Sequence, residues 1–191
     1  MQEFCIFYQA AATDKSISQC IIGLMAMFSH IFRALNDAGI DYLVVGGLAV
    51  VLHGYARITR DVDLMIGLDH KNCEQAIKVF ESLGYYPRLP VNAFDFADSE
   101  IRKKWLENKN MKVMTFISKE NPLVEIDVFA ELPHDFPDML KRAESKTLEG
   151  ILVPVASIDD IITLKESAGR AKDLEDIEAL KIIKKNRDKE D

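Results

Sequence analysis

Hydrophobic residues recur at helical spacing near the start of the chain. They predict a helix over residues 17–38 with Gly39 as its C-cap, because apolar side chains three and four positions apart fall on one helical face. The positions on this face are Ile21, Leu24, Met25, Phe28, Ile31, Phe32 and Leu35. A similar stripe predicts a helix over residues 71–83 that ends at Gly84. Residues 1–15 show no period, so we expect a poorly ordered N-terminal segment.

Shorter apolar runs between these two helices predict strands. The run "DYLVVG" at 41–46 is typical of a buried strand, and "LAVVLHGY" at 48–55 predicts a short helix after it. Strict alternation returns in "DVDLMIG" at 61–67. Because side chains alternate between the faces of a strand, Asp61 and Asp63 are expected on one face and apolar residues on the other.

The rest of the chain continues this mixture of elements. Prolines, aromatic residues and a charged run at 85–110 predict a loop, a short helix and a second loop. Strands are predicted over 112–118 and 123–132, on either side of the turn signal "ENP". A further strand is predicted over 150–156, and two helices then follow Ser157, the expected N-cap of the first.

Strands interleaved with helices predict an α/β (α+β) fold, a mixed sheet flanked by helices. The length of 191 residues suits one domain with a substantial core. We assign that domain to residues 16–191, with its core at 40–130 and a C-terminal helical part at 157–187.

Composition and charge exclude several classes of protein. The chain has 24 basic and 31 acidic residues, which argues against a general nucleic-acid coat because affinity for polyanions comes mainly from neutralised phosphates. Its cysteines, Cys5, Cys20 and Cys73, lack the spacing of a zinc site or a disulfide framework and indicate reduced thiols in the cytoplasm. No apolar run reaches the 18 or so residues of a membrane span, and no secretory signal is expected.

Acidic residues inside predicted strands are the first sign of chemistry. Asp61 and Asp63 share one strand face, and Asp127 lies in the middle of a later apolar strand. Burying such carboxylates unpaired costs several kcal/mol each, so they should meet water in a cleft or a cation. Clustered carboxylates suit Mg²⁺, and two such ions about 4 Å apart can clamp a phosphoryl group during its transfer. Glu125 shares the face of Asp127 and is a rival for the third position.

A glycine pair precedes these acidic residues. Gly46 and Gly47 end the predicted strand and let the backbone approach a ligand closely, while the next helix offers free N–H groups to a phosphate. Arg57 and Arg60 lie between the glycines and the aspartates. Two interpretations of these arginines are equally favoured: they steer a triphosphate, or they pair with an aspartate.

Together these residues form the motif GG-x-A-x-x-x-H-G-x-x-R-x-T-x-D-x-D, from Gly46 to Asp63. The motif resembles the nucleotidyltransferase superfamily of the DNA polymerase β type. It is most similar to the small prokaryotic branch of minimal nucleotidyltransferases and AbiEii-like toxin domains. The resemblance covers residues 40–67, 123–130 and 157–181.

The resemblance implies roles for the matching residues. Asp61 and Asp63 would hold catalytic Mg²⁺, two ions in all, and Asp127 would complete one metal site and lower the pKa of an acceptor hydroxyl. Gly46 and Gly47 would cradle the β- and γ-phosphates of a nucleoside triphosphate such as ATP. Many active members have serine at the second turn position, where this chain has glycine.

Basic residues near the C-terminus allow two interpretations. Lys165, Arg170 and Lys172 lie around a predicted helix junction and either contact phosphate or form a solvated face. His53 follows an apolar helix and is expected to be a packed residue without a catalytic role.

The sequence therefore predicts a cytoplasmic, Mg²⁺-dependent nucleotidyltransferase that releases pyrophosphate. Its acceptor is a small molecule, a protein side chain or a tRNA end, and no membrane partner is expected. The alternative is a nucleotide- or RNA-binding module of a toxin–antitoxin pair without turnover. A metal-dependent phosphohydrolase is a weaker option, because the chain has only four histidines and the three in its middle lie far apart in the sequence.

Overall fold

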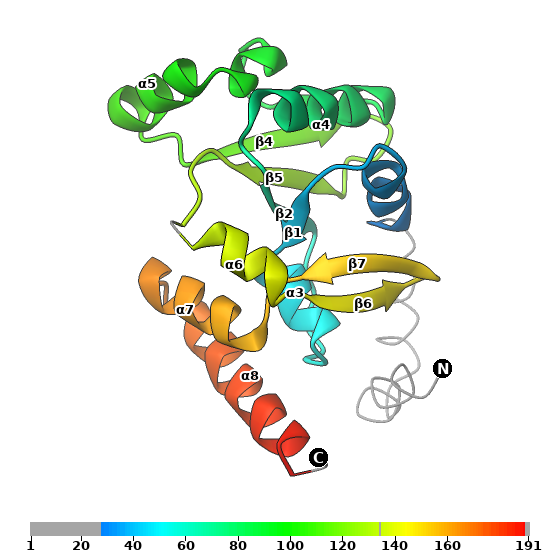
Figure 1. Ribbon diagram of the computed structural model, residues 1–191, viewed down its shortest axis with the longest axis vertical. Coiled ribbons are helices and arrows are strands. Elements are labelled where there is room, and N and C mark those ends of the chain that lie inside the picture. Colours follow the sequence, from blue (N-terminus) through cyan, green and yellow to red (C-terminus); the bar gives the residue numbers. More distant parts are fainter. Residues whose placement is uncertain (1–27, 134, 190–191) are drawn as a thin grey trace.

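A mixed sheet with helices around it forms the body of the protein, as the sequence predicts (Figure 1). The computed structural model describes residues 28–133 and 135–189. Within these residues seven strands form one sheet in the order β3-β4-β5-β2-β1-β7-β6. The strands are β1 (Tyr42–Val44), β2 (Asp61–Ile66), β3 (Tyr85–Pro87), β4 (Val113–Ser118), β5 (Glu125–Phe129), β6 (Glu144–Leu148) and β7 (Ile151–Val155).

Helices are interleaved with the strands along the chain. They are a helix over residues 28–37, α3 (Gly46–Leu52), α4 (His70–Ser82), the 3-10 helix η1 (Ala93–Ala97), α5 (Ser99–Lys109), α6 (Phe136–Lys141), α7 (Ile158–Ala168) and α8 (Asp173–Arg187). Figure 1 shows α4 and α5 at one end of the molecule and α7 and α8 at the other, with the sheet between them. No helix in the described part of the chain is both long and apolar enough to span a bilayer.

The predicted apolar stripes pack into the core. Phe28, Ile31, Phe32 and Leu35 are fully buried on the helix over residues 28–37, and the first half of that predicted helix lies outside the described residues, as does the segment 1–15. On α4 the buried positions are Cys73, Ala76, Ile77 and Phe80. Burial of each large apolar side chain contributes roughly 1.5–3 kcal/mol, so these faces fix both helices against the sheet. Cys73 is a free, buried thiol, and the other two cysteines lie outside the described residues.

Three elements differ from the sequence prediction. The region 85–110 was expected to begin with a loop, but its first residues form β3, whose three residues include a proline and which is held by pairing with β4. The strand β6 and the short helix α6 were not expected either. The sequence of β6 is ESKTL, mostly polar, and the strand forms because a tight turn at Glu149 and Gly150, both with positive φ, folds it antiparallel onto β7.

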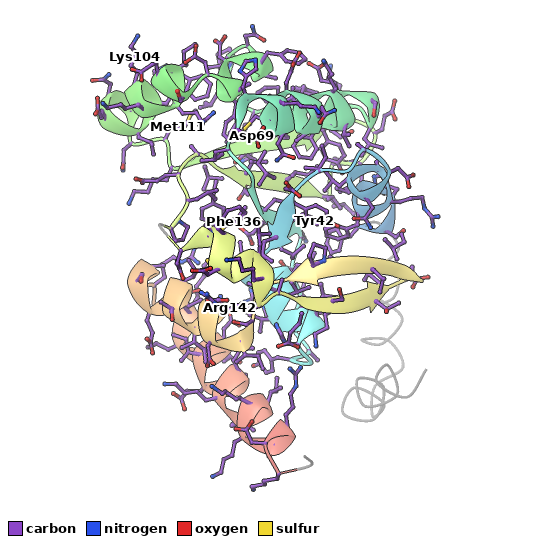
Figure 2. All side chains as sticks on the ribbon, viewed as in Figure 1. Tyr42, Asp69, Lys104, Met111, Phe136 and Arg142 are labelled. Carbon is purple, nitrogen blue, oxygen red and sulfur yellow. The ribbon has the colours of Figure 1, made fainter. Side chains whose placement is uncertain are left out.

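Polar contacts join α6 to α7. Arg142 directly follows α6 (Figure 2). It donates hydrogen bonds of 2.8 and 3.0 Å to the two carboxylate oxygens of Asp160. Ser157 accepts a 3.2 Å hydrogen bond from the Asp160 backbone N–H, which confirms it as the N-cap of α7. These contacts fix the start of α7, whose other end approaches the carboxylates described next.

Candidate active site

The central strands β2 and β5 bring four acidic residues to one face of the sheet. They pair in parallel, with Asp61 opposite Glu125 and Asp63 opposite Asp127. Directly paired residues point to the same face, so the four carboxylates share it. The intervening residues Val62, Leu64, Ile126 and Val128 are at most 1% exposed and point into the core. The expectation that Asp127 neighbours the first two aspartates is therefore met by the strand register.

The row of polar residues continues toward the edge of the sheet. Thr115 on β4 is opposite Asp127, and the backbone N–H of Arg88 donates a 2.9 Å hydrogen bond to the Thr115 carbonyl. The row therefore crosses three strands at Asp63, Asp127 and Thr115 and ends at Arg88, directly after β3. Beside this row, Asp61 pairs with Glu125, and Ile117 pairs with Tyr86.

The two rivals for the third acidic position have different partners. Asp127 accepts a 2.6 Å hydrogen bond from the Thr115 hydroxyl, whereas Glu125 forms an ion pair with Arg88. Burial raises the pKa of Asp127, and the Thr115 hydroxyl opposes that rise. Arg88 therefore pairs with Glu125 and also lowers the pKa of Asp127, which has no ion pair of its own among the described residues.

Asp63 lies between the glycine pair and Asp127. Its Oδ2 accepts a 3.3 Å hydrogen bond from the Gly47 backbone N–H. Burial, and then repulsion from Asp127, raise the pKa of Asp63 to about 6. A cation bound beside Asp63 would favour its ionised form and so oppose both effects.

The first glycine of the pair lies directly against Asp63. Gly46 has a φ of +64°, and a Cβ on it would lie 1.9 Å from Asp63 Oδ2. No other residue fits without displacing that carboxylate. Both glycines begin α3, so the turn that the sequence predicts is also the first turn of the helix.

Buried charges lie beside this site at the junction of α7 and α8. Lys165 donates hydrogen bonds of 3.0 Å to Asp173 and 2.7 Å to Asp176, and all three are at most 5% exposed. Arg57 also pairs with Asp176, and Arg170 donates a 2.6 Å hydrogen bond to Asp173. We call these five residues the charge network.

The charge network shows which basic residues are buried and which aspartates they pair with. Lys165 is buried, so the solvated-face alternative is wrong for it, whereas Lys172 and Arg60 are exposed. Arg57 pairs with an aspartate, as one of its two interpretations requires. Lys165 lowers the pKa of Asp63, and Asp63 raises that of Arg170, so both cations act on the carboxylate site electrostatically.

His53 is a packed residue, as expected. Its ring is 3% exposed, with Nε2 2.7 Å from the Ala156 carbonyl oxygen, and burial lowers its pKa to about 4. It joins the end of α3 to the end of β7 and stays neutral at physiological pH.

The chemistry of the acidic residues fits Mg²⁺, which prefers oxygen ligands. Their side chains are not arranged as a finished site: among residues 28–133 and 135–189 no three acidic, histidine or cysteine side chains form a group that could hold a metal. Asp63 faces Gly47 and Asp127 faces Thr115. A metal would therefore require these carboxylates to turn from those partners.

Sequence reasoning missed four residues around the site. Arg88 follows the unexpected strand β3, and Thr115 becomes significant only through the β4–β5 register. Asp173 and Asp176 were given no role, but they are 2% and 3% exposed at the start of α8. Their spacing of three positions, on the same face as the buried Ile177 and Leu180, is the signal that could have revealed them.

Comparisons with known proteins agree with this architecture. Residues 23–187 match the family described as "Nucleotidyltransferase of unknown function (DUF6036)". A search of curated proteins gave no match.

Solved structures share the fold at low sequence identity. The antibiotic-resistance factor ANT(2")-Ia, in complex with adenylyl-2"-tobramycin, has a TM-score of 0.55 and 15% identity over 82% of this chain and 86% of its own. The lincosamide antibiotic adenylyltransferase LnuA with lincomycin bound has a TM-score of 0.51 and 18% identity over 89% and 98%. An antigenic nucleotidyltransferase-like protein from Paracoccidioides brasiliensis has a TM-score of 0.51 and 22% identity over 82% and 74%.

Proposed function

Because the chain belongs to the DUF6036 family of nucleotidyltransferases, we propose that it moves a nucleoside monophosphate from a nucleoside triphosphate to an acceptor hydroxyl with the help of Mg²⁺. The acceptor oxygen attacks the α-phosphorus, the bond from that phosphorus to the bridging oxygen breaks, and pyrophosphate leaves. The observation that carries the proposal is the pairing of Asp63 with Asp127, with Gly46 in contact with Asp63.

Each part of the site has a role in this proposal. Asp61, Asp63 and Asp127 would hold Mg²⁺, which would neutralise the triphosphate and lower the pKa of the acceptor hydroxyl. Asp127, which accepts a hydrogen bond from Thr115, would orient the acceptor hydroxyl and accept its proton. Gly46 and Gly47 offer backbone N–H groups to the phosphates.

The basic residues act on the triphosphate in the same proposal. Lys165 and Arg170 contribute positive potential from the charge network, and Arg57 and Arg60 approach from the loop before β2. Arg60 is exposed and free to follow the nucleotide, whereas Arg57 is fixed by Asp176.

The acceptor is proposed to be a small hydroxylated molecule. The names of ANT(2")-Ia and LnuA describe complexes with antibiotics, which supports a small acceptor for this fold. A protein side chain and a tRNA end are the other classes, and a net charge of −7 disfavours long nucleic acid. A cytoplasmic location also remains a proposal, resting on the widely spaced cysteines.

Radiolabelled nucleotides test this function. The protein is incubated with Mg²⁺, a cell extract and each nucleoside triphosphate in turn, labelled at either the α- or the γ-phosphorus. Transfer of a nucleoside monophosphate puts only the α-label on the acceptor, and EDTA or Asp61→Asn should abolish it.

Other outcomes distinguish the rival functions. A module of a toxin–antitoxin pair without turnover would label nothing, and a phosphohydrolase would release phosphate without labelling an acceptor. Label transfer that is unchanged in Asp61→Asn would contradict the proposed site.

A further inference from the structure

Thr59 has a buried hydroxyl beside the glycine pair. It lies two residues before Asp61 and is 7% exposed. Its Oγ1 donates one long hydrogen bond, 3.4 Å, to the Asp61 carbonyl. A contact of that length is weak, so the hydroxyl can turn toward a better acceptor at little cost.

The space next to this hydroxyl is open because residue 47 has no side chain. A Cβ on Gly47 would lie 2.9 Å from Thr59 Oγ1 and 3.4 Å from Arg57 Nη2. Two donors, a hydroxyl and a guanidinium, therefore converge on the point where a side chain of residue 47 would begin. The neighbouring Gly46 contacts Asp63, so this point adjoins the carboxylate site.

Both donors are held in place. Arg57 pairs through Nη1 with Asp176, which also accepts a hydrogen bond from the buried Lys165, and this leaves Nη2 directed at Gly47. Thr59 is β-branched, which restricts its χ1 angle. Rigid donors lose little entropy when they bind an anion, so the arrangement suits a phosphate oxygen.

We propose that Thr59 binds the triphosphate: its hydroxyl, together with Arg57, donates a hydrogen bond to a phosphate oxygen in the space left by Gly47. This inference rests on the proposed function, because it assumes that the triphosphate lies at the glycine pair. It adds a binding residue and explains why residue 47 is glycine in this chain: a larger side chain would displace the Thr59 hydroxyl.

Calorimetric titration with inorganic tripolyphosphate and Mg²⁺ tests whether the Thr59 hydroxyl binds phosphate. This ligand has no nucleobase, so the preferred nucleotide need not be known. Thr59→Val keeps the shape of the side chain and removes the donor, so affinity should fall about tenfold, as expected for one hydrogen bond to a charged oxygen. Thr59→Ser keeps the donor and should bind within about twofold of the wild type. Thr147→Val, an exposed threonine on β6, is the matched control and should leave affinity unchanged.

An exchange of side chains tests the geometry. Gly47→Ser places a Cβ against the Thr59 hydroxyl and should weaken tripolyphosphate binding at least tenfold. In the double variant Gly47→Ser with Thr59→Ala, the contact is relieved and the serine supplies the hydroxyl, so affinity should recover to within about threefold of the wild type. Thermal unfolding of every variant shows whether it folds.

The outcomes separate the two proposals. Wild-type affinity in a folded Thr59→Val, or equal losses in Thr59→Ser and Thr59→Val, would overturn the role of the hydroxyl and leave the proposed function intact. A wild-type protein that binds neither tripolyphosphate nor any nucleoside triphosphate would overturn both.

Discussion

At the scale of single residues, the unpaired charge of the acidic cluster has a measurable consequence for stability. Burial and the neighbouring carboxylates raise the pKa of Asp63 to about 6, above the usual value near 4. The folded state therefore binds a proton between pH 4 and 6 that the unfolded state does not, so stability falls as pH rises through this window. In the absence of metal, ionised Asp63 weakens the fold at neutral pH.

Asp63→Asn should remove this dependence. We expect the variant to be about 1–2 kcal/mol more stable than the wild type at pH 7.5 without metal, and close to it at about pH 3.5, below both pKa values. Urea unfolding at the two pH values measures this difference. An equal gain in unfolding free energy at both pH values would show that ionisation of Asp63 does not destabilise the fold.

Asp127 and Glu125 should differ in their effect on metal binding. Glu125 is neutralised by Arg88, whereas Asp127 lies directly beside Asp63 without a cation of its own. We expect Asp127→Asn to weaken Mn²⁺ binding at least tenfold and Glu125→Gln to change it less than about threefold, as measured by titration followed by electron paramagnetic resonance. The reverse order would make Glu125 the third ligand.

At the scale of elements, the turn between β1 and α3 depends on one glycine. Gly46 and Gly39 both have a φ of +64°, but only a Cβ at Gly46 would meet another atom within 4 Å. The two positions therefore separate the cost of a left-handed backbone from the cost of a collision.

Gly39→Ala should cost about 1 kcal/mol of unfolding free energy, the price of positive φ alone. Gly46→Ala should cost more than about 3 kcal/mol, because Asp63 must also move. Chemical denaturation of the two variants gives both values. Similar costs would show that the contact between Gly46 and Asp63 relaxes freely.

The sequence predicts a helix or strand where the pattern of apolar and polar residues within that element decides its structure. The stripes on α4 and the helix over 28–37, and the alternation in β2 and β5, are visible because one face of each is buried. By contrast, β3 and β6 have little pattern and exist through their neighbours β4 and β7. A single sequence does not show such pairing, because it depends on tertiary contacts.

At the scale of the whole molecule, the site joins parts of the chain that are distant in sequence. The motif from Gly46 to Asp63 was predicted as one local unit, and Asp127 was added because it interrupts an apolar strand. Only the strand register shows that Arg88 and Thr115 lie beside the site. The pairing of Arg57 with Asp176 likewise depends on how α8 packs, which the charge pattern of that helix did not reveal.

The charge network also explains the position of the C-terminal helices. Asp173 and Asp176 on α8 are almost fully buried and share Lys165 of α7. Removing one partner from a buried ion pair costs roughly 3–5 kcal/mol, so α7 and α8 stay together while their cations face the carboxylate site. The nucleotide would then bind between the charge network and the acidic face of the sheet.

The most direct test is a crystal structure of the protein with Mn²⁺ and a nucleoside triphosphate analogue that resists cleavage between its α- and β-phosphates. Anomalous scattering locates the metal independently of the model. We expect a peak bound by Asp61, Asp63 and Asp127, with the phosphates against Gly46 and Gly47. A nucleotide bound elsewhere, or a peak away from these carboxylates, would contradict the account.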